Sequence, residues 1–322
     1  MNFTHHQELI ERELQRIAED CGNNTLYDPV KYILSLGGKR LRPALTLVTC
    51  ELYNQNVNKA LPAAAAFEVF HNFTLMHDDI MDHAPLRRGK QTVHEKWNVN
   101  QAILSGDAMF VLSVQLIAKS DPAVMPELLN LFNKTALEVC EGQELDMAFE
   151  NREDVSIPEY IEMIRLKTSV LVAACMAAGA IAAGAGASEA KGCYDFGENL
   201  GIAFQLHDDY LDTFGEAGKT GKLSGGDILA DKKTFLLIRA LEKAQDSDIS
   251  LIKSLFGRQN SSKEKVITIR NIFLENAIDK ELLALADDYY NKALQALENL
   301  HISHSGKEVL KRFASTLMAR DH

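Results

Sequence analysis

Apolar residues recur along the chain at intervals of three and four, the spacing that gives an α-helix one buried face. Strict alternation of apolar and polar residues between turn residues, which is typical of strands, is missing. The pattern therefore predicts helices almost throughout. We expect them at residues 4–20, 29–36, 42–53, 60–82, 99–119, 122–150, 158–178, 188–213, 231–245, 248–256, 261–276, 279–300 and 305–320.

Proline positions agree with this division of the chain. Asp28-Pro29, Leu61-Pro62, Asp121-Pro122 and Ile157-Pro158 fall where helices should begin, and Ser156 with Glu159 forms a capping-box pattern. No Pro/Ser-rich linker or low-complexity tail divides the sequence, so we expect a single domain over residues 1–322.

Charge and composition exclude several classes of function. The formal net charge of −11 argues against nucleic-acid backbone as the main partner. The five cysteines are scattered without a Cys-x-x-Cys pair, as expected for reduced thiols in a cytoplasmic protein. Residues 1–13 are polar, and the uncharged stretch 169–188 is mostly Ala and Gly. This stretch reads as a closely packed buried helix, so we expect no transmembrane segment.

An acidic motif follows the apolar helix at residues 60–82. In His77-Asp78-Asp79-x-x-Asp82, helical geometry places Asp78 and Asp82 on one face, about 6 Å apart along the axis. Two carboxylates on one face suit a hard divalent cation such as Mg²⁺. The pattern recurs as His207-Asp208-Asp209-x-x-Asp212. Two such motifs on different helices could face one cavity, as in the metal sites of helix bundles.

A third acidic pair, Asp287-Asp288, serves as a comparison. It is followed by Asn291 instead of a third aspartate, and nothing basic or glycine-rich comes soon after it. We interpret this pair as part of a solvated helix face.

Basic residues accompany both motifs. The turn Gly37-Gly38-Lys39-Arg40-Leu41-Arg42 offers backbone N–H groups and cations to an anion, although a solvated capping turn has the same composition. Arg87-Arg88 follows the first motif and either pairs with its carboxylates or binds phosphate. Lys167-Thr168 interrupts an apolar helix face, where the lysine either snorkels to solvent or holds a phosphate. Lys222 and Lys232 flank a glycine loop after the second motif.

These segments together resemble the trans-polyprenyl (isoprenyl) diphosphate synthase family. GGKRLRP, LMHDDIMDHAPLRRG, LKTS, FQLHDDYLD and GKLSGGDILADKKTFLL occur in the family's order and at suitable spacing, from about Tyr32 to Leu237. The resemblance implies an all-α bundle of antiparallel helices around a deep central cavity, the isoprenoid synthase type I fold. It also implies a homodimer, for which the Ala-rich stretches near 60–66 and 102–117 are candidate surfaces.

The resemblance assigns roles to individual residues. The metal ligands, for three Mg²⁺ ions, would be Asp78, Asp79, Asp82, Asp208, Asp209 and Asp212. The allylic-diphosphate contacts would be Arg87, Lys167, Thr168, Gln205, Lys222 and Lys232, of which Lys167 and Lys222 join the aspartates as catalytic residues. The isopentenyl-diphosphate contacts would be Lys39, Arg42, His71 and Arg88. One departure is Asp231, where relatives often carry Asn.

The implied reaction is metal-dependent head-to-tail prenyl transfer from dimethylallyl, geranyl or farnesyl diphosphate to isopentenyl diphosphate, with release of diphosphate. Family resemblance says that an aromatic residue five positions before the first motif limits product length. Phe73 occupies that position, with Thr74 beside it and Phe70 a turn deeper. We expect an all-trans C15–C20 product, with geranylgeranyl diphosphate favoured.

Two alternatives remain at this point. A class I terpene cyclase shares the aspartate-rich motif but has no need of the isopentenyl contacts. A non-catalytic subunit of a heteromeric synthase would not need both motifs complete, because close carboxylates are costly without a cation.

Overall fold

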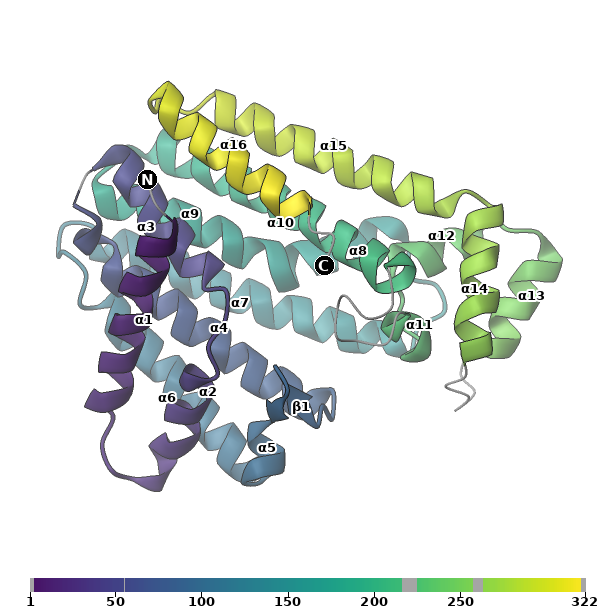
Figure 1. Ribbon diagram of the computed structural model, residues 1–322, viewed down its shortest axis with the longest axis horizontal. Coiled ribbons are helices and arrows are strands. Elements are labelled where there is room, and N and C mark those ends of the chain that lie inside the picture. The colour runs from purple at the N-terminus through teal and green to yellow at the C-terminus, as the bar shows by residue number, and fades with distance from the viewer. Residues whose placement is uncertain (1–2, 55, 216–224, 257–262, 320–322) are drawn as a thin grey trace. The chain divides into compact units, whose positions relative to one another are not determined.

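The structure confirms that the protein is all-α. A computed structural model describes residues 3–54, 56–215, 225–256 and 263–319, and within them the two strands are each only two residues long. Figure 1 shows helices of very different length, coloured by their place in the chain. The described residues form two compact units. The single domain expected over residues 1–322 therefore stays a prediction.

The first unit contains residues 1–134, 174–194 and 301–303. Its elements are α1 (Phe3–Asp20), α2 (Asp28–Ser35), α3 (Leu41–Tyr53), α4 (Leu61–Met81), β1 (Leu86–Arg87), β2 (Lys90–Gln91), α5 (Val93–Lys96) and α6 (Val99–Ile117), with 3₁₀ turns at Thr25–Tyr27 and Val57–Lys59. Three further helices contribute residues to both units, namely α7 (Met125–Glu150), α9 (Val170–Ala183) and α10 (Ala187–Phe214).

Helix α4 is central to the first unit. It packs against α6 along much of its length and also contacts α1, α2 and α3 (Figure 1). Small residues allow this close packing, and the side chains of Ala63–Ala66 have no exposed area. Ala63–Ala66 are thus buried within the first unit, and the dimer surface expected near residues 60–66 stays a prediction.

The second unit contains residues 135–173, 195–300 and 304–322. Tyr160, Leu206, Phe235 and Phe273 belong to its hydrophobic core, where α8, α10, α12 and α14 meet. Its remaining elements are α8 (Ile157–Ile164), a π-helical turn (Arg165–Ser169), α11 (Gly226–Leu229), α12 (Phe235–Lys243), α13 (Asp246–Leu255), α14 (Lys263–Glu275), α15 (Ile278–Glu298) and α16 (His304–Met318).

The helix expected at 158–178 differs from its prediction in one respect. It begins with the expected capping box of Ser156 and Glu159, but a π-helical turn at Arg165–Ser169 interrupts the α-helical hydrogen bonding. A π-turn inserts an extra residue and is frequent at functional sites. The helical run Ile157–Ala183 is long and apolar enough to cross a membrane, but 78% of its most apolar window is buried within the protein. We interpret it as a core helix.

The helix expected at 231–245 begins later than predicted. Helix α12 starts at Phe235, and the preceding residues form the short helix α11 and a turn. The backbone of Asp231 has φ +57°, the left-handed conformation, which cannot continue a right-handed helix.

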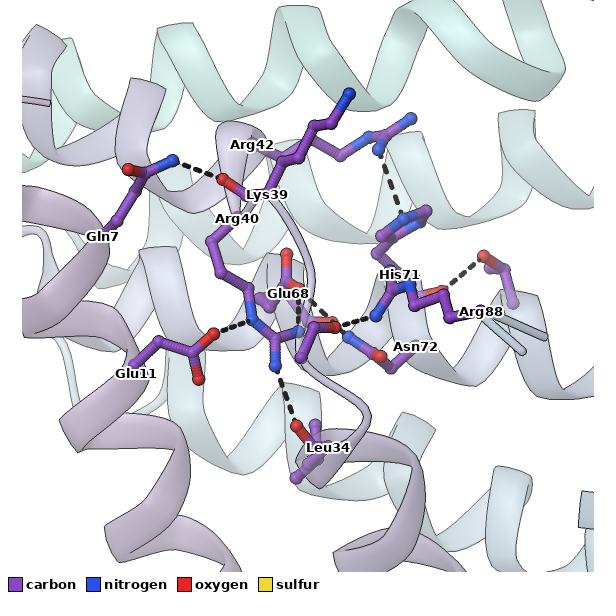
Figure 2. Close-up of polar contacts among 12 residues, drawn as sticks. Gln7, Glu11, Leu34, Lys39, Arg40, Arg42, Glu68, His71, Asn72 and Arg88 are labelled. Carbon is purple, nitrogen blue, oxygen red and sulfur yellow. Dashed lines mark hydrogen bonds and ion pairs between the residues drawn. The ribbon is translucent and has the colours of Figure 1, made fainter. Parts of the chain in front are cut away.

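A buried arginine fixes the basic glycine turn that precedes α3. Arg40 is 3% exposed and also has a left-handed backbone, with φ +46°. Its Nε donates to Glu11 Oε1 at 2.7 Å, its Nη1 to Glu68 Oε1 at 2.6 Å and its Nη2 to the Leu34 carbonyl at 2.8 Å. Figure 2 shows these bonds reaching three different segments of the chain. Arg40 thereby ties the turn to α1, α2 and α4.

Replacing Arg40 with Met should destabilise the protein by about 3–5 kcal/mol, because Glu68 would stay buried without its cation. The denaturation midpoint in urea measures this loss. Arg16→Met is the control, since Arg16 forms exposed ion pairs with Glu13 and Asp20, and such pairs contribute about 1 kcal/mol or less. Equal midpoints for the two variants would contradict a scaffold role for Arg40.

Candidate active site

The first acidic motif lies at the C-terminal end of α4. Asp79 is 2% exposed, Asp78 is half-buried, and Asp82, the C-cap residue, is exposed. The end of a helix carries partial negative charge, so carboxylates there are disfavoured unless positive charge lies nearby. The position of the motif therefore favours binding of a cation.

Arg87 neutralises the middle aspartate of this motif. Its Nε lies 2.9 Å and 2.8 Å from the two carboxylate oxygens of Asp79, and its Nη2 lies 2.7 Å from Oδ1. The sequence left open whether Arg87 pairs with the carboxylates or binds phosphate, and the structure shows the ion pair with Asp79. Its Nη1 takes no part in this contact, so this edge of the guanidinium is suited to binding a phosphate group.

A tight hairpin supports both arginines. Strands β1 and β2 pair antiparallel, and Arg88 and Gly89 between them have φ +53° and +73°. Positive φ at both central residues is the signature of a type I′ turn. Arg87 points to Asp79, whereas the Arg88 guanidinium donates through Nη1 to the Gly37 carbonyl of the basic turn. The hairpin thus connects the acidic motif to the glycine turn.

Arg42 and His71 form a second contact beside this turn. Arg42 Nη1 lies 3.2 Å from His71 Nε2 (Figure 2). An arginine is always charged and only donates, so Nε2 accepts and the histidine is neutral. Burial lowers the pKa of His71 well below its ordinary value, and the positive charges of Arg42 and Arg88 lower it further. Lys39 is exposed, and its side chain points away from the Arg40 network in Figure 2.

The second acidic motif occupies the last turns of α10, and its middle aspartate is again the buried one. Asp209 is 5% exposed, whereas Asp208 is exposed and Asp212 is half-buried. The Tyr160 hydroxyl donates to Asp209 Oδ2, and Gln205 Nε2 donates to Oδ1 at 3.0 Å. Burial, with repulsion from Asp227, raises the pKa of Asp209 to about 8. The two groups that bind Asp209, the hydroxyl of Tyr160 and the amide of Gln205, are neutral, whereas Asp79 is paired with a cation.

Asp212 is held by the residues that follow the motif. Its Oδ2 accepts from the Asp227 backbone N–H at 2.9 Å, and its carbonyl accepts from the Gly225 N–H at 2.6 Å. Lys232 is exposed at the other end of this short segment. Lys222, the other predicted contact of the loop, lies outside the described residues.

The π-helical turn presents Lys167 and Thr168. Lys167 Nζ donates to Asp146 Oδ2 at 2.5 Å, and Thr168 Oγ1 donates to Gln205 Oε1 at 3.3 Å. Gly142 permits close packing here, since a Cβ atom at this position would lie 2.3 Å from the Lys167 backbone nitrogen. Lys167 therefore makes an ion pair within the protein and does not simply snorkel to solvent.

The predicted chain-length residues lie in an aromatic cluster. The ring of Phe73 is 5.6 Å from that of Phe70, 4.7 Å from that of His77 and 5.7 Å from that of Phe110. Phe70 is 1% exposed, whereas Phe73 is half-buried. Thr74 donates its hydroxyl to the His71 carbonyl at 2.9 Å. Phe73, like Phe110, thus keeps some exposed surface, whereas Phe70 keeps almost none.

Most of the predicted residues are gathered within their own units. The first unit holds the first acidic motif with Lys39, Arg42, His71, Arg87 and Arg88, and the second holds the other motif with Lys167, Thr168, Gln205 and Lys232. Within the described residues, no three His, Cys, Asp or Glu side chains are arranged to hold a metal ion. That the two acidic motifs face each other across one cavity stays a prediction.

Several supporting residues were missed by sequence reasoning. Glu68 could have been found, because it is the one charged residue between Leu61 and Leu75 and so needs a buried partner. Asp146 and Tyr160 have no comparable signal, since nothing distinguishes them from the other acids and tyrosines of the chain.

The lowered pKa of His71 predicts a pH effect on stability. The folded state binds fewer protons than the unfolded state, so this contribution is complete above about pH 6.5 and is lost as the pH falls below it. A His71→Gln variant should lose this dependence, and its deficit in unfolding free energy should shrink between about pH 7.5 and 5.5. His304→Gln, at an exposed position, should follow the wild type. Parallel curves for wild type and His71→Gln would contradict the burial of a neutral ring.

Comparisons with known proteins identify the family. Residues 23–273 match the family model described as polyprenyl synthetase. The chain is 35% identical over 319 residues to the short chain isoprenyl diphosphate synthase of Methanothermobacter thermautotrophicus, covering 98% of this chain and 97% of that protein. It is 36% identical over 317 residues to the geranylgeranyl pyrophosphate synthase of Geoglobus acetivorans, with 98% and 97% covered. A crystal structure of a geranylgeranyl pyrophosphate synthase is similar with a TM-score of 0.95 and 45% identity, covering 99% of each chain. The chain therefore belongs to the polyprenyl synthetase family of prenyltransferases.

Proposed function

We propose that this protein condenses isopentenyl diphosphate with dimethylallyl, geranyl or farnesyl diphosphate to an all-trans C15–C20 prenyl diphosphate, with geranylgeranyl diphosphate favoured. Prenyl chain elongation follows from family membership. The observation that carries the finer proposal is the shared construction of the two motifs. In each, the middle aspartate is buried and held by protein groups, and the outer two border solvent at a helix C-terminus.

The donor set fits Mg²⁺, and we propose three ions per site. Asp78, Asp82, Asp208 and Asp212 would supply oxygen ligands, which are the ligands that Mg²⁺ prefers. Asp79 and Asp209, which the resemblance also names as metal ligands, would in addition orient these four aspartates, since both are held by hydrogen bonds within the protein. When bound, the ions supply positive charge beside the phosphate oxygens of the substrate.

The basic residues divide between two diphosphates in this proposal. Lys39, Arg42, His71 and Arg88 would bind isopentenyl diphosphate. Arg42 suits this role because its Nη1 is oriented by His71, and preorganised donors bind an anion at little cost. The allylic diphosphate would contact Arg87, Lys167, Thr168, Gln205, Lys222 and Lys232.

The chemistry follows from the charge that develops. The bond from the allylic carbon to the diphosphate oxygen breaks, and Arg87, Lys167 and Lys232 would stabilise the departing anion. The double bond of isopentenyl diphosphate attacks the allylic cation, and a new carbon–carbon bond forms. A proton then leaves the condensed product, with the departed diphosphate as its acceptor. Water must be excluded because it would capture the cation, and the aromatic cluster around Phe73 suits a dry cavity.

A homodimer in the cytoplasm is part of the proposal. Ile103, Leu104 and Val111 are 40%, 57% and 55% exposed on α6, one of the two stretches that the sequence suggested as a dimer surface. Exposed apolar residues grouped on one helix favour association with a partner. Packing of this face of α6 against a second copy of the chain would cover these three side chains.

A product assay tests the function directly. With Mg²⁺, isopentenyl diphosphate and each allylic primer in turn, the protein should yield linear prenyl alcohols up to C20 after phosphatase treatment, detected by mass spectrometry. Asp78→Asn and Asp208→Asn should each lower kcat by about 10²-fold or more, since each removes a charge that would hold the leaving group's counterions.

Asp287→Asn is the matched control, because Asp287 belongs to an exposed acidic pair on α15. It should leave the rate unchanged. Cyclic hydrocarbon products would indicate a terpene cyclase, and absence of product with every primer would indicate a non-catalytic subunit. Full turnover after chelation of divalent metal would contradict the role given to the aspartates.

Phe73→Ala should lengthen the product, because it removes the half-buried ring that would stop the growing tail. Chromatography of the alcohols should show chains beyond C20 at the expense of the wild-type product. Phe70→Ala should chiefly lower stability, by about 3–5 kcal/mol, since its ring is already buried in the core. An unchanged product distribution in Phe73→Ala would place the floor of the cavity elsewhere.

A further inference from the structure

Lys265, near the start of α14, is the one buried lysine among the described residues, with 2% of its surface exposed. Its ammonium group donates to Asp231 Oδ1 and lies 4.7 Å from the centre of the Phe256 ring. A lysine in the first turn of a helix opposes the helix dipole, and its burial costs desolvation. Nothing in α14 itself accounts for a charged residue here.

Asp231 is also in an unfavourable position, just after the C-terminal end of the short helix α11. The Asp231 N–H bonds to the Ile228 carbonyl at 3.3 Å, and the Lys232 N–H bonds to the Asp227 carbonyl at 3.0 Å. These two bonds form a Schellman motif at the end of α11, with Asp231 at the left-handed position that glycine usually takes. A carboxylate at a helix C-terminus adds electrostatic cost. The ion pair offsets the cost of burying Lys265 and the cost of placing the Asp231 carboxylate at a helix C-terminus.

The segment of residues 225–232 connects two residues of the proposed site. Its start binds Asp212, and its last residue is Lys232. At one end, the backbone N–H groups of Gly225 and Asp227 bind Asp212. At the other end, Lys232 follows Asp231 directly, and its backbone is fixed by the Schellman bond. The geometry of this segment therefore sets the position of Lys232 relative to Asp212.

The first turn of α14 supports the segment at both ends. Lys265 binds Asp231, and the next residue, Val266, packs on Gly225 so closely that a Cβ atom there would lie 2.5 Å from Val266 Cγ1. Gly225 has φ +86° and adopts this conformation without strain. Two adjacent residues of one helix thus contact the start and the end of the segment.

We propose that Lys265 and Asp231 are positioning residues, and that their partly buried ion pair holds Lys232 in place for the allylic diphosphate. The inference rests on the proposed function for the role of Lys232. Neither residue needs to touch the substrate. A misplacement of about 1 Å in a substrate-positioning group can cost about 10²-fold, so an indirect contact of this kind can control affinity.

A double-mutant cycle between positions 265 and 232 tests this. Lys265→Met should raise the KM for geranyl diphosphate about tenfold or more while the KM for isopentenyl diphosphate stays unchanged. The same change in a Lys232→Met background should add little, because coupled residues are not additive. Equal effects in both backgrounds, or no effect of Lys265→Met, would overturn the proposal.

Two further variants make the result unambiguous. Lys263→Met, an exposed lysine on the same helix, should change neither KM. Asp231→Asn removes the charge but tolerates the left-handed backbone, and it replaces Lys265→Met in the cycle if that variant fails to fold.

Binding of inorganic diphosphate with Mg²⁺, followed by calorimetry, separates this inference from the proposed function. The Kd should weaken about tenfold or more in Lys265→Met, and less in the Lys232→Met background. A wild type that binds diphosphate but elongates no primer would contradict the proposed function alone. A wild type that elongates normally, with an additive cycle, would contradict this inference alone.

Discussion

The concentration of negative charge at the ends of two helices is the constraint on which the rest depends. Three aspartates close α4 and three more close α10, where the helix dipole and mutual repulsion both oppose them. The protein neutralises this charge only in part. Arg87 balances Asp79, whereas Asp209 receives hydrogen bonds from Tyr160 and Gln205. The donors to Asp209 are neutral, so a metal ion at the second motif would supply positive charge that these two contacts do not.

Buried ion pairs around the site have a different purpose from stabilisation. The Arg40–Glu68 pair is desolvated, and the Lys265–Asp231 pair is desolvated at its lysine end. Such pairs contribute little net free energy compared with apolar packing. They do require a specific geometry, and each lies next to a proposed contact with diphosphate. Arg40 lies between Lys39 and Arg42, and Asp231 precedes Lys232. Both are non-glycine residues with a left-handed backbone, which a turn retains when surrounding contacts determine it.

The helical fold could be predicted from the sequence, and the candidate site residues could be proposed from it, because their signals are local. Charged groups such as Asp78 or Lys167 stand out against an apolar helical pattern, and their spacing reports which helix face they share. The π-helical turn under Lys167 has no such signal, and its close contact with α7 at Gly142 appears only in the folded structure. The partners Asp146, Tyr160 and Lys265 were missed for the same reason. Each is an ordinary residue on an amphipathic helix, and only the tertiary fold brings it to its partner.

Helix α4 combines two opposed environments within one rigid element. Its first turns are alanines without exposed surface, its middle bears the aromatic side chains of Phe70 and Phe73, and its end bears the aspartates. The rise of about 1.5 Å per residue fixes the distance from Phe73 to Asp78 at about 7.5 Å along the axis. In the proposed function, a prenyl chain whose diphosphate is held at the aspartates would have its length measured against the same helix. Product length would then depend on which side chains line α4, and it could change without any change in the groups that carry out the chemistry.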